Sequence, residues 1–216
     1  MRIGSVFIGV YLWFIVSLFP VTSQAQEIIT VAVASSYYEK TKIYSAEFEK
    51  THDVKVRVVA GSTGRLYNQI KQGAPFDVFI AADQKRPALL GKKSQIIAFG
   101  YLGIQIGQTF THDLNALTQP NIKRIVIANP KTAPFGKAAQ QALMQAGLWE
   151  KVKPKLVYAQ NALQASMMVE KGLVGAGFVP VAKKEQAIAL LPYVAVLLLV
   201  DGEVQSFFDG LSVHLR

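Results

Sequence analysis

The sequence contains no cysteine and only three histidines, and both shortages narrow the chemistry that it can perform. Without cysteine there is no disulfide, no thiol nucleophile and no cysteine for a lipid anchor. The histidines, His52, His112 and His214, stand in polar surroundings typical of surface loops, and no Gly-x-Ser-x-Gly motif accompanies them. No His-x-x-x-His pair or acidic run indicates a metal site. A serine hydrolase mechanism therefore lacks an evident base, a thiol mechanism lacks its cysteine, and a metal site lacks an evident set of ligands.

Acidic residues are also scarce, at 14 against 23 lysines and arginines, which leaves a net charge of +9. A basic chain can bind nucleic acid, but these cations are scattered, with only pairs such as Lys92-Lys93 and Lys183-Lys184. We therefore expect no nucleic-acid partner and interpret the charge as a solvated surface that helps to attract anions.

Charge is absent from residues 3–20, an apolar stretch that follows Arg2. The small residues of Ser23-Gln24-Ala25 then match a signal-peptidase site, which predicts a cleavable signal peptide over residues 1–25 and export to the bacterial periplasm. An uncleaved membrane anchor is the alternative. The remaining chain, with 51% hydrophobic residues overall, is long enough for one large α/β domain or two small lobes.

Strand and helix patterns alternate from residue 28 onward, which is typical of α/β folds with parallel sheets. Strands are expected over residues 28–34, 54–60, 77–82, 123–128, 156–159 and 175–179. Helices are expected over residues 37–51, 66–72, 137–146 and 160–172. Because no flexible linker is visible, two lobes would have to be joined by crossing strands, and residues 101–107 and 193–198 are the candidates.

Three of the expected strand-to-helix turns share a chemistry suited to anions. They contain Ser35-Ser36, Ser62-Thr63 and the sequence TAPFG at residues 132–136. In a parallel sheet such turns lie at one edge, where helix N-termini present N–H groups and a partial positive charge. The hydroxyls could instead only cap helices, and GSTG at residues 61–64 lacks the Walker and dinucleotide spacings. Taken together, the three turns favour a cleft for a small, fully ionised oxyanion.

Longer motifs run through the chain, beginning with GSTG-x-L-x-x-Q-I, then GAPFDVFI and Ala82-Asp83, and continuing through IANPKTAPFGKAA, GLW, KPKLV and GAGFV, over about residues 28–179. In these motifs the sequence resembles the periplasmic molybdate-binding proteins of ABC importers. The resemblance implies a type II periplasmic binding protein, in which two α/β lobes are joined by a strand hinge with the ligand cleft between them. Lobe 1 would comprise residues 26–100 and 195–216, and lobe 2 residues 101–194.

The resemblance also implies the ligand set. The expected molybdate-binding residues are Ser35, Ser36, Ser62, Thr63, Phe135 and Ala162. The last two would donate from their backbone N–H groups. A tyrosine donor of some members would fall at Pro180, which has neither a hydroxyl nor an N–H group. Such a protein is no enzyme, needs no cofactor, acts as a monomer, binds molybdate and tungstate, and delivers them to a membrane permease.

Two alternatives to this function stay open. One is a binding protein for another tetrahedral oxyanion, such as sulfate or thiosulfate, and the other is a periplasmic serine hydrolase that uses Ser36 or Ser62. A donor-only cavity disfavours protonated anions such as phosphate, whereas sulfate must be rejected by size. The chain also departs from the family pattern, because the region of residues 90–123 is shorter and the usual final helix is not evident. We expect thinner cover over lobe 1 as a result.

Overall fold

The computed structural model describes residues 26–91, 94–96, 98–191, 195–198 and 210. The expected signal peptide over residues 1–25 and the expected loss of a final helix lie outside the described residues. Within the described part of the chain, no helix is both long enough and apolar enough to cross a membrane.

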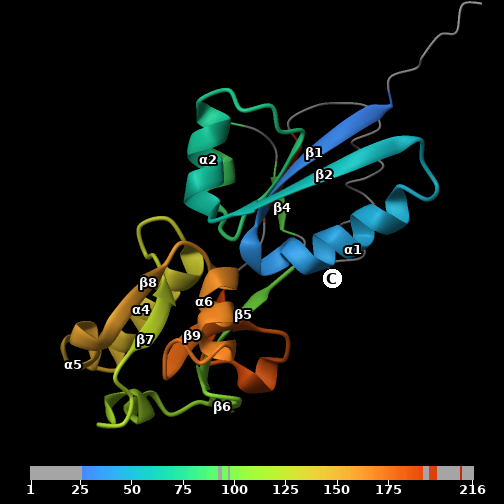
Figure 1. Cartoon of the computed structure of the whole chain (residues 1–216). Coiled ribbons are helices and arrows are strands. Elements are labelled where there is room, and N and C mark those ends of the chain that lie inside the picture. Colours follow the sequence, from blue (N-terminus) through green and yellow to red (C-terminus); the bar gives the residue numbers. More distant parts are fainter. Residues whose placement is uncertain (1–25, 92–93, 97, 192–194, 199–209, 211–216) are drawn as a thin grey trace, which may run out of the picture.

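The first sheet has the strand order β2-β1-β3-β11-β4, and Figure 1 labels β1, β2 and β4 of it. Its strands are β1 (Glu27–Ala34), β2 (Val54–Gly61), β3 (Val78–Ile80), β4 (Ser94–Ile96) and β11 (Ala195–Leu198). Strand β1 runs parallel to β2 and β3, whereas β11 is antiparallel to β3 and β4. The accompanying helices are the 3-10 turn η1 (Ser35–Tyr37), α1 (Tyr38–Phe48), α2 (Thr63–Lys71) and α3 (Lys85–Leu89). We call this unit lobe 1.

The second sheet has the order β10-β5-β9-β7-β8, and β6 pairs with β5. Its strands are β5 (Gly100–Ile106), β6 (Thr109–Thr111), β7 (Ile125–Ala128), β8 (Leu156–Ala159), β9 (Ala176–Val181) and β10 (Ala189–Leu191). Strand β7 is parallel to β8 and β9, whereas β5 is antiparallel to β9 and β10. The accompanying helices are α4 (Pro134–Gln145), α5 (Trp149–Val152), α6 (Ala162–Glu170) and the 3-10 turns η2 (Leu114–Thr118), η3 (Lys153–Lys155) and η4 (Lys184–Gln186). We call this unit lobe 2.

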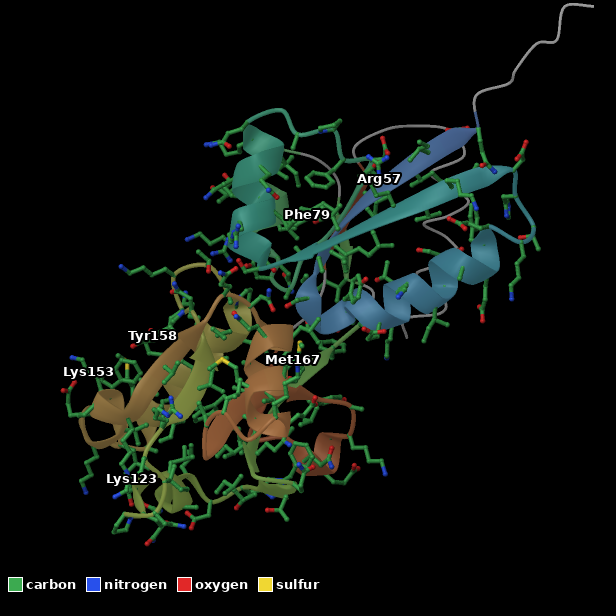
Figure 2. All side chains as sticks on the ribbon, viewed as in Figure 1. Arg57, Phe79, Lys123, Lys153, Tyr158 and Met167 are labelled. Atoms are coloured by element: carbon green, nitrogen blue, oxygen red, sulfur yellow. The ribbon has the colours of Figure 1, made fainter. Side chains whose placement is uncertain are left out.

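Each sheet is covered by helices on both faces because its central strands are apolar on both sides. In β1, Ile29, Val31 and Val33 pack in the same core cluster as Phe48 of α1, whereas Ala32 packs with Leu66 of α2 and with Phe79. The alternation follows from the two-residue period of a strand. Figure 2 shows Phe79 between α2 and the strands.

Lobe 2 repeats this construction with other residues. Ile125 and Ile127 of β7 pack with α4, whereas Val126 packs with Ala165 and Val169 of α6. These central strands therefore hold the N-termini of α4 and α6 beside the same sheet edge.

The chain passes between the sheets twice, from β4 to β5 and from β10 to β11, and Figure 1 labels β4 and β5 on either side of the first passage. The first passage lies between Ile96 and Gly100. The sequence predicted a crossing near residues 101–107, and the passage lies just before them, because residues 101–106 belong to β5 and pair within the second sheet. Gly100, which the sequence assigned to lobe 1, is the first residue of that strand. The second passage spans residues 192–194, which lie outside the described residues.

Candidate functional site

Strand-to-helix turns from both lobes meet at a small cavity. The six residues expected from the sequence to bind a ligand, Ser35, Ser36, Ser62, Thr63, Phe135 and Ala162, all line it. About 10 Å³ is open to the centre of a water molecule. That is room for about one water, and the hydrogen bond between Ser35 and Leu163 joins the two lobes beside it.

Two hydroxyls of this cavity, those of Ser36 and Ser62, are buried and have no hydrogen-bond partner among the described residues. Ser62 is the N-cap residue of α2, yet its side chain makes no capping hydrogen bond. The simple cap interpretation of Ser62 is therefore wrong in this structure. A buried hydroxyl without a partner costs about 1 to 3 kcal/mol, which a ligand that accepts hydrogen bonds would remove.

The neighbouring hydroxyls of Ser35 and Thr63 are already engaged. Thr63 Oγ1 accepts a hydrogen bond from the backbone N–H of Ala82 at 2.9 Å. Ser35 Oγ accepts one from the backbone N–H of Leu163 at 3.3 Å, and this bond joins lobe 1 to lobe 2. Each hydroxyl pair thus contains one member tied to the protein and one that is not.

Lobe 2 presents the starts of two helices to the cavity. Phe135 is the second residue of α4 and follows Pro134, whose missing N–H costs little at the first helical position. Ala162 is the first residue of α6, so its amide has no carbonyl partner within the helix. The N-cap residue Asn161 accepts a hydrogen bond from the N–H of Gln164 at 2.9 Å, which fixes this helix start. Both helix N-termini favour negative charge in the cavity.

A larger cavity of about 620 Å³ lies beside the small one and shares Ser36 and Phe135 with it. Tyr37, Lys40 and Pro180 are among its other lining residues. Burial, followed by the nearby Tyr101, raises the pKa of Tyr37 far above its usual value, so its hydroxyl stays protonated at neutral pH. The sequence interpretation missed this cavity, because the residues that line it come from separate parts of both lobes.

The described histidines lie elsewhere. His52 closes α1, where its ring stacks on Phe48 with centroids 3.7 Å apart and its Nδ1 lies 2.9 Å from Thr51 Oγ1. His112 is exposed after β6, and neither histidine lines either cavity. His214 lies outside the described residues. Asp83 accepts a hydrogen bond from the N–H of Arg86 at 2.8 Å, in the turn that leads into α3.

Three further hydrogen bonds bridge the lobes beside the cavity. The N–H of Gly64 donates to the carbonyl oxygen of Thr132 at 2.8 Å. Arg65 Nη1 donates to Gln160 Oε1 at 3.0 Å, and Arg86 Nη2 donates to a carbonyl oxygen of the same lobe 2 turn, that of Lys131, at 3.4 Å. In these three hydrogen bonds, lobe 1 supplies the donors and lobe 2 the acceptors.

Known proteins share this architecture and much of this sequence. A family model described as bacterial extracellular solute-binding protein matches residues 29–198. The molybdate-binding protein ModA of Azotobacter vinelandii is 39% identical over 166 residues, covering 73% of this chain and 66% of that protein. ModA of Rhodobacter capsulatus is 31% identical over 159 residues, covering 70% of this chain and 63% of that protein. This chain thus spans slightly less than two thirds of the length of these relatives.

Solved structures agree with the sequence relatives. The structure of a periplasmic molybdate-binding protein from Azotobacter vinelandii superposes with a TM-score of 0.73 at 25% identity, covering 86% of this chain and 92% of that one. The predicted fold class, two α/β lobes of a type II periplasmic binding protein, is confirmed by this likeness and by the two sheets. The chain belongs to the bacterial extracellular solute-binding protein family.

Proposed function

We propose that this protein is the solute-binding component of an ABC importer for molybdate, and that it also accepts tungstate. The observation that carries the proposal is a pair of buried hydroxyls, Ser36 and Ser62, that have no hydrogen-bond partner in the described part of the chain and lie in one cavity between two lobes. The two relatives described above, which are named as molybdate-binding proteins, support the choice of ligand.

In the proposed ligand shell, Ser36 and Ser62 donate directly to the oxyanion. The backbone N–H groups of Phe135 and Ala162 donate from the N-termini of α4 and α6, while Ser35 and Thr63 shape the two turns through their own bonds. Each hydrogen bond to a charged group contributes about 1.5 to 3 kcal/mol. Several of them can offset dehydration and leave the ~8 to 12 kcal/mol of a micromolar-to-nanomolar binder.

Hydroxyl and N–H donors also provide selectivity. The N–H groups at the two helix starts cannot accept a hydrogen bond, which disfavours hydrogen phosphate wherever its O–H group would face them. Because the closed cavity has room for about one water molecule, the lobes must part to admit an anion and close again around it. The parted and closed states give a membrane permease two forms to distinguish.

The proposal includes the cellular setting. A signal peptide over residues 1–25 would export the chain to the periplasm, where a monomer without cofactor or nucleic-acid partner would bind its anion and pass it to the permease. This role involves no catalysis. Neither His52 nor His112 lines the cavity, so the serine-hydrolase alternative gains no base from the described residues.

The proposed function is tested by calorimetric titration with molybdate, tungstate, sulfate and thiosulfate. We expect tight binding of the first two with about one anion per chain. Binding of sulfate or thiosulfate alone, or of none of the four, would refute the molybdate assignment. Hydrolysis of a nitrophenyl ester that disappears in Ser36→Ala would favour the hydrolase instead.

A further inference from the structure

We infer that Gly64 sets ligand affinity without touching the ligand, because the backbones of the two lobes meet directly at this residue. The inference rests on the proposed function, in which the lobes close around an oxyanion. In this inference Gly64, the second glycine of the GSTG sequence, allows the two lobes to close, whereas Ser62 in the same sequence contacts the anion.

The approach of the lobes at Gly64 leaves no room for a side chain. The Gly64 N–H donates to the Thr132 carbonyl oxygen at 2.8 Å. A Cβ atom built on Gly64 would lie 2.8 Å from that oxygen and 3.1 Å from Thr132 Cα. Contacts below 3.0 Å to a backbone atom force something to shift, and here the atom in the way belongs to the other lobe. A methyl group at residue 64 therefore opposes closure itself.

Lobe 1 does not need this glycine for its own fold. Gly64 is the second residue of α2 and is not among the glycines with positive φ, so other residues can adopt its backbone conformation. Of the three atoms nearest to the built Cβ, two belong to Thr132 and the third is the flexible end of Arg86, at 3.1 Å. Alanine is also the better helix former at this position. Gly136 differs, because its Cβ would lie 1.8 Å from the Ala128 carbonyl oxygen within lobe 2.

The other two bridges on this side depend on the same approach. Arg65 Nη1 reaches Gln160 at 3.0 Å, and Arg86 Nη2 reaches the Lys131 carbonyl oxygen at 3.4 Å. Residues 64 and 65 are adjacent in α2, so holding the lobes apart at Gly64 lengthens these bonds as well. These three hydrogen bonds between the lobes are therefore lost together, and the anion is no longer enclosed.

The test compares Gly64→Ala with Gln69→Ala, a control on the exposed surface of the same helix. Since the chain has no native cysteine, cysteines at the exposed positions Gln72 and Lys137 can carry two spin labels that report the distance between α2 and α4. Calorimetry measures molybdate binding, and thermal unfolding measures stability without ligand. We expect Gly64→Ala to weaken molybdate binding about tenfold or more, from the cost of overpacking a close contact.

The same variant should shift the label distances to longer values and should unfold at the wild-type temperature or above when no ligand is present. Gln69→Ala should match wild type in all three measurements. Equal affinity and equal distances in Gly64→Ala and wild type would overturn the inference. So would a clear loss of stability without ligand, because the glycine would then serve the fold of lobe 1.

One outcome separates this inference from the proposed function. If wild type binds no molybdate but shows a short label distance that Gly64→Ala lacks, the ligand assignment fails and the role of Gly64 stands. If wild type binds molybdate and Gly64→Ala binds it equally well, the role of Gly64 fails and the ligand assignment stands.

Discussion

Replacing Ser36 with alanine should change ligand affinity and the stability of the empty protein in different ways. Ser36 Oγ is buried in the cavity and has no partner among the described residues. Donation to an anion would contribute about 1.5 to 3 kcal/mol, so Ser36→Ala should weaken molybdate binding by roughly 10- to 150-fold. Without ligand, the variant loses no hydrogen bond and should unfold at the wild-type denaturant concentration or slightly above it.

Thr41→Val is the matched control for this experiment. Thr41 Oγ1 is also buried and unpartnered among the described residues, but Thr41 lines neither cavity. Valine keeps the shape of threonine, so the variant should bind molybdate with wild-type affinity. Titration calorimetry gives the molybdate affinity of each variant, and urea unfolding gives the free energy of unfolding of each. Wild-type affinity in Ser36→Ala, or an equal loss in both variants, would refute the direct contact between Ser36 and the anion.

Three further predictions concern other parts of the molecule. Gly136→Ala should cost about 3 kcal/mol or more in urea unfolding, since its Cβ would lie 1.8 Å from the Ala128 carbonyl oxygen; wild-type stability would contradict this packing. Arg65→Ala should weaken molybdate binding by less than about 1.5 kcal/mol in calorimetry, because its bond to Gln160 is exposed; a larger loss would give Arg65 a direct ligand role. A backbone hydrogen bond from β2 lowers the pKa of Glu49 against a smaller opposing effect of burial, with help from the nearby lysine. The ionised form therefore stabilises the fold above about pH 4.5, and this contribution disappears as the pH falls through the lowered pKa, so acid unfolding should affect Glu49→Gln less than wild type.

The sequence pattern indicated which turns come together more accurately than it placed the passages between the lobes. Hydroxyls and glycines after apolar runs mark strand-to-helix turns, and these turns do meet at one cavity. The start of α2 was predicted at Leu66, but the helix begins at Thr63, because Thr63 already adopts helical geometry while Ser62 is the extended N-cap residue. A crossing was predicted near residues 101–107, but the passage lies just before them, and residues 101–106 form a strand paired within the second sheet. Strand partners are set by tertiary packing, which a local pattern does not contain.

The roles within each hydroxyl pair could not be read from the sequence either. Ser35 and Ser36 are adjacent and chemically identical, yet one accepts a hydrogen bond from lobe 2 and the other has no partner among the described residues. The difference comes from the position of Leu163, more than a hundred residues away in the chain. Only the approach of the two lobes distinguishes them.

Closure and ligand binding are coupled by the same unpartnered hydroxyls. With the lobes closed and no anion bound, Ser36 and Ser62 would each be buried without an acceptor among the described residues, at a cost of about 1 to 3 kcal/mol per group. When the lobes part, water can reach both hydroxyls and this cost disappears, so the empty protein is biased toward opening against the bridges at Gly64 and Arg65. An oxyanion supplies the missing acceptors, removes the penalty and lets the bridges hold the lobes together. An anion that satisfies only one hydroxyl leaves part of the penalty in place, so the cavity selects its ligand through the free energy of closure.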